Sequence, residues 1–263
     1  MGRLLRHRKL KPRHGGYRGR AWEPRDLDAL ATAVADLALG QWLHVEELLR
    51  SEEPWRVSGA DYAIDGAISL LTVPAGKDPW HRDGWVFQLV SWLAAVEEND
   101  GPARIPQMDQ ASKGFDGLQI AVNSRSGQPK RIVVFEDKAT NSPRDTVRDD
   151  VWKSFAELET GSRNPALAAE VGYLLSRIPL TDPRKTIDHL MRKQSGRAYR
   201  VSITTKAHHA RAERFNGLFD GFEETVPGKR RRRRANVLEI ADLRPWMDDL
   251  CDRAIAVLEG QRV

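Results

Sequence analysis

Residues 113–140 read KGFDGLQIAVNSRSGQPKRIVVFEDKAT, and this stretch decides the expected fold. Two apolar runs flank a polar turn at residues 123–129 that contains Gly and Pro, so the pattern predicts a β-hairpin. The second run, Arg131–Phe135, is rich in β-branched and aromatic residues, which is typical of a strand inside a covered sheet. It then becomes ionic at Glu136, Asp137 and Lys138.

Side chains alternate along a strand, so Glu136 and Lys138 should share one face and Asp137 should point to the other. Asp116 lies near the start of the first strand, and a hairpin of this length brings it close to Glu136. Burying two carboxylates beside an ammonium costs free energy. Two hard oxygen donors suit Mg²⁺, which takes its other ligands from water and phosphate. A lysine beside them can stabilise charge on phosphorus or position a water. The arrangement predicts a site for phosphodiester hydrolysis.

A Glu-x-Lys pair on a strand is also common as a solvated ion pair that contributes little to stability. That interpretation predicts polar residues along the whole face. Ile132 and Val134 share the face of Glu136 and Lys138, so the ionic pair continues an apolar face. The catalytic interpretation is therefore favoured.

These residues resemble the signature of the PD-(D/E)xK nuclease superfamily, an acid followed after roughly ten to thirty residues by Glu-x-Lys. Here Asp116 is followed by nineteen residues and then by Glu136-Asp137-Lys138, and Phe115 replaces the proline of the motif. The resemblance covers roughly residues 83–178, with weaker support to residue 205. It implies an α/β fold with a restriction-endonuclease-like core of α-β-β-β-α-β order, a mixed central sheet flanked by helices.

The resemblance also implies a magnesium-dependent endodeoxyribonuclease with Asp116, Glu136 and Lys138 as catalytic residues. Mg²⁺ or Mn²⁺ would bind Asp116, Glu136 and the backbone carbonyl of Asp137. The preceding helix often adds a glutamate in this superfamily, and the corresponding position here is Gln88, which brings no charge. Glu97 and Glu98 at the end of that helix are alternatives. DNA is favoured over RNA because most relatives cut DNA.

A small nuclease without a sequence-reading module also resembles the effectors of bacterial antiviral (anti-phage) defence systems. A helicase, ATPase or sensor subunit is therefore an expected partner that regulates cutting, and a homo-oligomer is a further expectation. One alternative is a catalytically degenerate nucleic-acid-binding or assembly subunit of a defence or repair complex. Another is an interaction protein whose basic segments bind an acidic partner.

The 263-residue chain carries a formal charge of +5 that is unevenly distributed. Residues 1–20 contain eight Lys or Arg and no acid, and a run of six basic residues follows later. Such blocks bind polyanions by releasing counterions, although a generic solubility tail has the same composition. We expect the later run to be a protruding basic hairpin tip that binds nucleic acid through Lys229, Arg230, Arg231, Arg232, Arg233 and Arg234.

The expected domains are a basic flexible arm at residues 1–22, an N-terminal extension at 23–80 and a nuclease-like domain at 81–263. The extension should begin with a helix from Pro24 to Leu49, and Tyr62–Val73 fits a strand or a buried helix equally well. Further helices are predicted at 83–99, 144–158, 165–177, 181–194 and 242–259, and strands at 103–108, 198–205, 221–226 and 236–240.

The single cysteine, Cys251, excludes an internal disulfide and a cysteine-based zinc site. No apolar run approaches the length of a membrane span, and the arginine-rich start lacks the apolar segment of a secretory signal. No membrane association is expected, and a cytoplasmic location is the default expectation.

Overall fold

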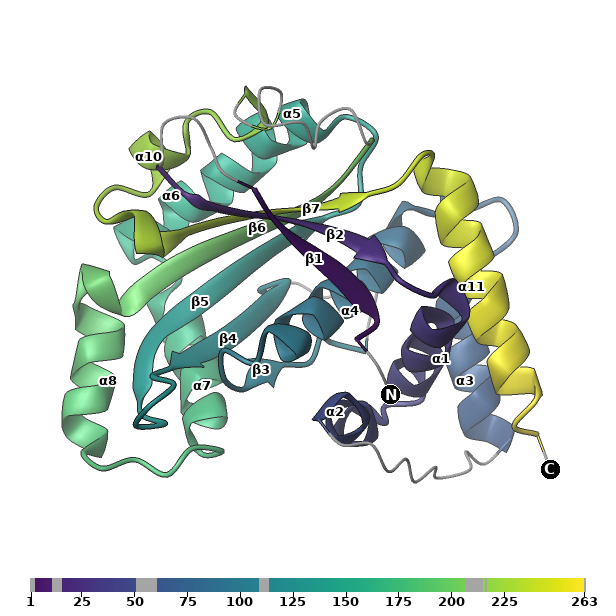
Figure 1. Ribbon diagram of the computed structural model, residues 1–263, viewed down its shortest axis with the longest axis horizontal. Coiled ribbons are helices and arrows are strands. Elements are labelled where there is room, and N and C mark those ends of the chain that lie inside the picture. Colours follow the sequence, from purple (N-terminus) through teal and green to yellow (C-terminus); the bar gives the residue numbers. More distant parts are fainter. Residues whose placement is uncertain are drawn as a thin grey trace.

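A seven-stranded mixed sheet with a curled shape, flanked by helices, forms the centre of this α/β protein (Figure 1). The computed structural model describes residues 3–10, 16–50, 61–108, 114–206, 215 and 217–262. The strand order is β1-β2-β7-β6-β5-β4-β3, in which β2, β7, β6 and β5 run parallel and both edges are antiparallel. The strands are β1 (Leu5–Leu10), β2 (Arg18–Pro24), β3 (Ala103–Arg104), β4 (Gly117–Val122), β5 (Pro129–Lys138), β6 (Arg197–Thr205) and β7 (Arg233–Glu239).

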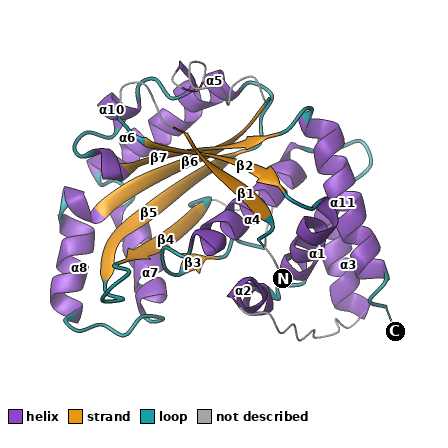
Figure 2. Cartoon of the chain, in the orientation of Figure 1, coloured by secondary structure: helices purple, strands orange, loops and turns teal. Residues whose placement is uncertain are grey.

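Helices cover both faces of the sheet (Figure 2). One face carries α1 (Leu27–Ala38), α2 (Trp42–Arg50), α3 (Asp61–Leu71), α4 (Trp80–Glu98) and α11 (Leu243–Glu259). The other carries α5 (Pro143–Thr146), a π-helical turn (Val147–Val151), α6 (Trp152–Thr160), α7 (Asn164–Leu175), α8 (Pro183–Arg192) and α10 (Phe222–Thr225). Short 3₁₀ turns lie at Gln194–Gly196 and Arg230–Arg232.

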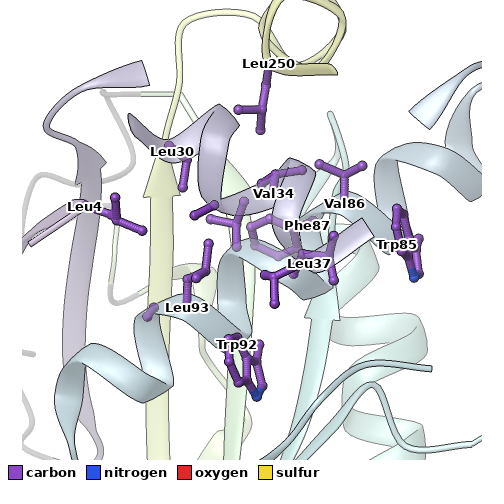
Figure 3. Packing of buried hydrophobic residues seen from close by; sticks show 14 of the residues in the cluster. Leu4, Leu30, Val34, Leu37, Trp85, Val86, Phe87, Trp92, Leu93 and Leu250 are labelled. Atoms are coloured by element: carbon purple, nitrogen blue, oxygen red, sulfur yellow. The ribbon is translucent and has the colours of Figure 1, made fainter. Parts of the chain in front are cut away.

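Strand β5 divides two hydrophobic cores because its side chains alternate between the faces of the sheet. Val133 and Phe135 belong to the core under α1, α4 and α11, whereas Ile132 and Val134 belong to the core under α6 and α7. Figure 3 shows the first core, where side chains of α1, α4 and α11 meet. The helices of residues 23–80 thus share one core with α4 and α11. Strand β5 is covered on both sides, as its composition predicts.

The prediction of a flexible arm at residues 1–22 is wrong for residues 3–10 and 16–22, which are the part that the structure describes. Residues 5–10 and 18–24 form β1 and β2, and Leu5 and Trp22 are fully buried. Arg6, Arg8 and Lys9 lie on the edge strand β1, where Arg8 is paired with Glu239. Charged edge strands are common because they discourage pairing with other chains. Because many of their residues are cationic, β1 and β2 do not show a clear strand pattern in the sequence.

Most other predicted elements are present. The hairpin is confirmed as antiparallel β4 and β5, and residues 62–71 prove to be helical. The strand predicted at 221–226 is wrong, because a left-handed Gly221 (φ 91°) opens a single helical turn, α10. The strand predicted at 103–108 is limited to two residues. The sequence also offers Arg211 and Arg214 as phosphate contacts and His208 and His209 as a less favoured ligand pair, and these four residues lie outside the described residues.

Among the described residues, the helices are too short or too polar to cross a lipid bilayer.

Candidate active site

The register of the hairpin brings Asp116 beside Glu136. Gly117 pairs with Phe135 across the two strands, so Asp116, one residue earlier, falls next to Glu136. Gly117 is needed for this close approach, because a Cβ there would lie 2.4 Å from Cδ2 of Phe135. The register and this glycine therefore place two acids that are distant in sequence at the same edge of the sheet.

Lys138 lies between the two carboxylates. Its Nζ is 2.9 Å from Oδ2 of Asp116 and 2.9 Å from Oε2 of Glu136. Burial alone would lower the pKa of Lys138, but the adjacent carboxylates outweigh it and the pKa is raised. Lys138 is therefore a charged ammonium whose position is fixed by two acids.

Asp116 is held from two further directions. Gln88 on α4 donates from Nε2 to Oδ1 of Asp116 at 3.1 Å, and the backbone N–H of Asp137 donates to Oδ2 at 2.9 Å. Gln88 thus points into the site, as predicted, but it acts there as a donor. The two bonds fix the carboxylate plane without adding negative charge.

Glu136 is almost completely buried and receives a short hydrogen bond from the hydroxyl of Ser154 on α6. Burial, followed by repulsion from Asp116, raises the pKa of Glu136 to about 6. Ser154 follows the π-helical turn of residues 147–151, and such turns are frequent at functional sites. The sequence did not reveal Ser154, because neither the turn nor a contact across 18 residues leaves a local pattern.

Asp137 points to the opposite face of β5, as strand alternation predicts. Its carboxylate accepts a hydrogen bond from Ser91 on α4 at 2.7 Å and lies 3.9 Å from Nη2 of Arg200 on β6. Burial raises the pKa of Asp137 to about 6 and lowers the pKa of Arg200 to about 10. The guanidinium stacks 3.4 Å from the ring centre of Phe135. Only the backbone of Asp137 faces the site, and a buried polar network supports it from behind.

Glu97 and Glu98, the alternative metal ligands, take no part in the site. Glu97 accepts hydrogen bonds from the backbone of Leu4 and from His7, and Glu98 is paired with Arg20 at 2.7 Å. Both carboxylates are buried and fasten β1 and β2 to the end of α4.

The six-residue basic run is not a protruding tip, and this prediction is wrong for half of its residues. Arg232 and Arg233 are 2% and 4% exposed. Arg232 pairs with Glu159 at 2.7 Å, and Arg233 donates to backbone carbonyls. Arg234 is bonded to Asp100 at 2.8 Å and Arg231 is half-buried, so the exposed cations of the run are Lys229 and Arg230. Guanidinium groups have five donors and satisfy carbonyls inside a fold, so a charge run need not be solvated.

The carboxylate oxygens of Asp116 and Glu136 suit a cation that needs few protein ligands. Within the described residues, no group of three or more His, Cys, Asp or Glu side chains is arranged to hold a metal. Asp116 and Glu136 nevertheless both contact the Lys138 ammonium. The space between the two carboxylates therefore favours positive charge. Mg²⁺ commonly uses one or two carboxylates and completes its shell with water and phosphate oxygens. The site fits such an ion and does not fit a structural cage.

Comparisons of this chain with models of protein families, with curated proteins and with solved structures find no match.

Proposed function

We propose that the protein is a metal-dependent nuclease of the PD-(D/E)xK type that hydrolyses phosphodiester bonds of DNA. One observation carries the proposal: two carboxylates from a hairpin lie 2.9 Å from the same lysine nitrogen at the end of a central strand. Phosphodiester hydrolysis needs a place for a divalent cation beside a group that stabilises negative charge. Asp116, Glu136 and Lys138 supply both.

The order of the elements supports the same assignment. Helix α4 is followed by β3, β4 and β5, then by α6 and β6, and β6 lies parallel to β5. This order is compatible with the α-β-β-β-α-β core that the resemblance implies. In such sheets ligands bind near strand ends, which is where Glu136 and Lys138 lie.

Asp116 and Glu136 would hold Mg²⁺ or Mn²⁺, with the backbone carbonyl of Asp137 as a third oxygen donor. The bound ion would act as a Lewis acid on a phosphate oxygen and lower the pKa of a water. Gln88 and Ser154 each donate a hydrogen bond to one carboxylate, which orients its oxygens.

Lys138 acts as a charged donor. Because Asp116 and Glu136 raise its pKa, Lys138 keeps its proton near neutral pH when no metal is bound. Its ammonium can orient an attacking water or stabilise charge on the phosphate oxygens in the transition state.

The biological setting that best suits this proposal is an effector of antiviral defence, regulated by a helicase, ATPase or sensor partner. In this proposal the chain supplies the hydrolytic site, and the partner supplies the regulation. Adding candidate partners to the nicking assay below tests this part of the proposal.

Plasmid nicking tests the function directly. Purified protein with supercoiled plasmid and Mg²⁺ should nick DNA, and Glu136→Gln and Lys138→Met should each lower the rate by about 100-fold or more. Glu157→Gln is the matched control, because Glu157 is an exposed glutamate on α6, one turn beyond Ser154. Equal nicking by wild type and Glu136→Gln would remove the site assignment.

A degenerate nucleic-acid-binding or assembly subunit is the second candidate. It is favoured by Gln88, an uncharged donor at the position where an acid often completes the metal site. A protein that binds DNA and shows no metal-dependent nicking, even with candidate partners, would support it.

A further inference from the structure

Helix α4 is buried along most of its length but open along one stripe. From Arg82 to Val96 every residue except Gly84 and Gln88 is buried. Trp80 and His81, at the start of the helix, are exposed. At about 100° per residue, positions 80, 81, 84 and 88 fall within a sector of about 100°. These four residues are called the open stripe.

The open stripe leads from an exposed aromatic ring to the candidate active site. Trp80 is 69% exposed, although tryptophan is among the largest apolar side chains. Gln88, at the other end, is bonded to Asp116 at 3.1 Å. The two ends are separated by two helical turns, or about 12 Å. Gly84 lies between them, and a Cβ added to it would meet nothing within 4 Å.

The four residues of the open stripe carry no negative charge, although the exposed acid Asp78 lies just before the helix. The acid of this part of α4, Asp83, is 2% exposed and is paired with Arg82 at 2.7 Å and with Arg244. A hollow of about 290 Å³ lies beside Trp80, and its polar lining includes Lys77, Asp78 and His81. That volume is at the small end of ligand pockets, which suits a single planar group.

We propose that the open stripe binds unpaired nucleotides of single-stranded nucleic acid, with one base stacked on Trp80 and the backbone running past Gly84 to Asp116. A base offers its face to an aromatic ring only when it is not sandwiched within a duplex, and such stacking is the usual basis of single-strand binding. A distance of about 12 Å corresponds to roughly three or four stacked nucleotides at 3.4 Å each. The inference rests on the proposed function for the direction of the strand, and it names unpaired nucleotides, including those that open in a supercoiled plasmid, as the substrate of that site.

Binding in EDTA, where no cleavage occurs, tests the stripe separately from the chemistry. Fluorescence anisotropy of the full chain with a labelled oligothymidylate should show a Kd about 5- to 150-fold higher for Trp80→Ala, the range of one lost stacking contact. Trp80→Phe should retain most of the affinity. Gly84→Leu should weaken binding by obstructing the stripe, whereas Gly84→Ala should not. Both Gly84 variants replace a helical glycine beside open space, so they should fold.

A blunt duplex of two complementary strands, which has no unpaired loop, is the control ligand, and its affinity should be the same for wild type and Trp80→Ala. Single-strand affinity that is unchanged by both Trp80→Ala and Gly84→Leu would overturn the inference, as would equal losses for single strand and duplex. Absence of oligothymidylate binding by wild type would also overturn it. If the Trp80 and Gly84 variants lose binding as expected but Glu136→Gln nicks plasmid normally, the proposed function fails and the binding stripe stands.

Discussion

Gln88 and Ser91 lie one turn apart on α4, and each donates a hydrogen bond to a different aspartate at the candidate site. Gln88 donates to Asp116 at 3.1 Å, and Ser91 donates to Asp137 at 2.7 Å. The backbone N–H of Asp137 in turn donates to Asp116 at 2.9 Å. One buried helix therefore positions both Asp116 and Asp137.

Truncating these two residues should separate activity from stability. Gln88→Ala releases one oxygen of a partly exposed carboxylate, so it should lower nicking by about tenfold and stability by less than about 1 kcal/mol. Ser91→Ala leaves a buried carboxylate and Arg200 without their hydroxyl partner, which should cost about 1–3 kcal/mol. Urea unfolding and plasmid nicking measure the two effects. Equal profiles for the two variants would contradict the division of roles.

Replacing Gln88 by glutamate should strengthen metal binding. A third carboxylate beside Asp116 adds a hard oxygen ligand but repels the existing acids when no cation is bound. Gln88→Glu should therefore melt at a lower temperature than wild type in EDTA and show a larger increase in melting temperature with Mn²⁺. Gln88→Ala is the matched control, in which the increase should not exceed that of wild type.

Asp137 and Arg200 should behave as a coupled pair. Removing one partner of a buried ion pair leaves an uncompensated charge and costs about 3–5 kcal/mol. Arg200→Met and Asp137→Asn should each destabilise the protein, and the double variant should lose less than the sum of the two. A coupling free energy of about 0.5–3 kcal/mol is expected from urea unfolding. Additive losses would show that the 3.9 Å separation carries no interaction.

Stability should fall with rising pH through the titration of Asp137. Its pKa is about 6 in the folded protein against 3.8 for the unperturbed group, so the folded state binds the proton more tightly. The resulting stabilisation is complete below about pH 4 and is lost as pH rises through about 6. Between pH 4.5 and 7.5, the unfolding free energy of wild type should decline relative to Asp137→Asn by about 2 kcal/mol. Parallel pH profiles would contradict the raised pKa.

The basic run should divide into structural and solvated cations. Arg232→Ala removes the buried partner of Glu159 and should destabilise the fold by about 3 kcal/mol. Lys229→Ala should change stability by less than about 0.5 kcal/mol, whereas Arg230→Ala also loses a hydrogen bond to the Tyr17 carbonyl and should cost about 1 kcal/mol. If these exposed cations contact phosphates, each substitution should reduce the slope of log K against log salt by about 1. An unchanged slope would remove them from the nucleic-acid interface.

The sequence predicts the hairpin, helix α4 and the two-sided environment of β5, because these depend on local periodicity. Strand alternation also places Glu136 with Lys138 and turns Asp137 away. The meeting of Asp116 and Glu136 follows from the hairpin register. These features could be predicted because each is encoded within a short segment.

Contacts between distant segments could not be predicted in this way. Ser91, Ser154 and Arg200 reach the site from other elements, and nothing in their own surroundings in the sequence marks them. The same limit explains the basic run, because the number of arginines does not reveal whether carbonyls or water satisfy their donors. The roles of these residues depend on partners that are distant in the sequence, and a single sequence does not identify those partners.

Pairing of β2 with β7 has a consequence for synthesis of the protein. Arg18 lies opposite Arg234 and Trp22 lies opposite Leu238. A ribosome adding roughly 5–20 residues per second would release β7 some 10–40 s after β2. During that interval the nascent β2 lacks its central neighbour, while the residues from Gln88 to Ser154 are synthesised well before β7. The hairpin that carries the acids can therefore form first, and β1 and β2 join the sheet only after β7 has been synthesised.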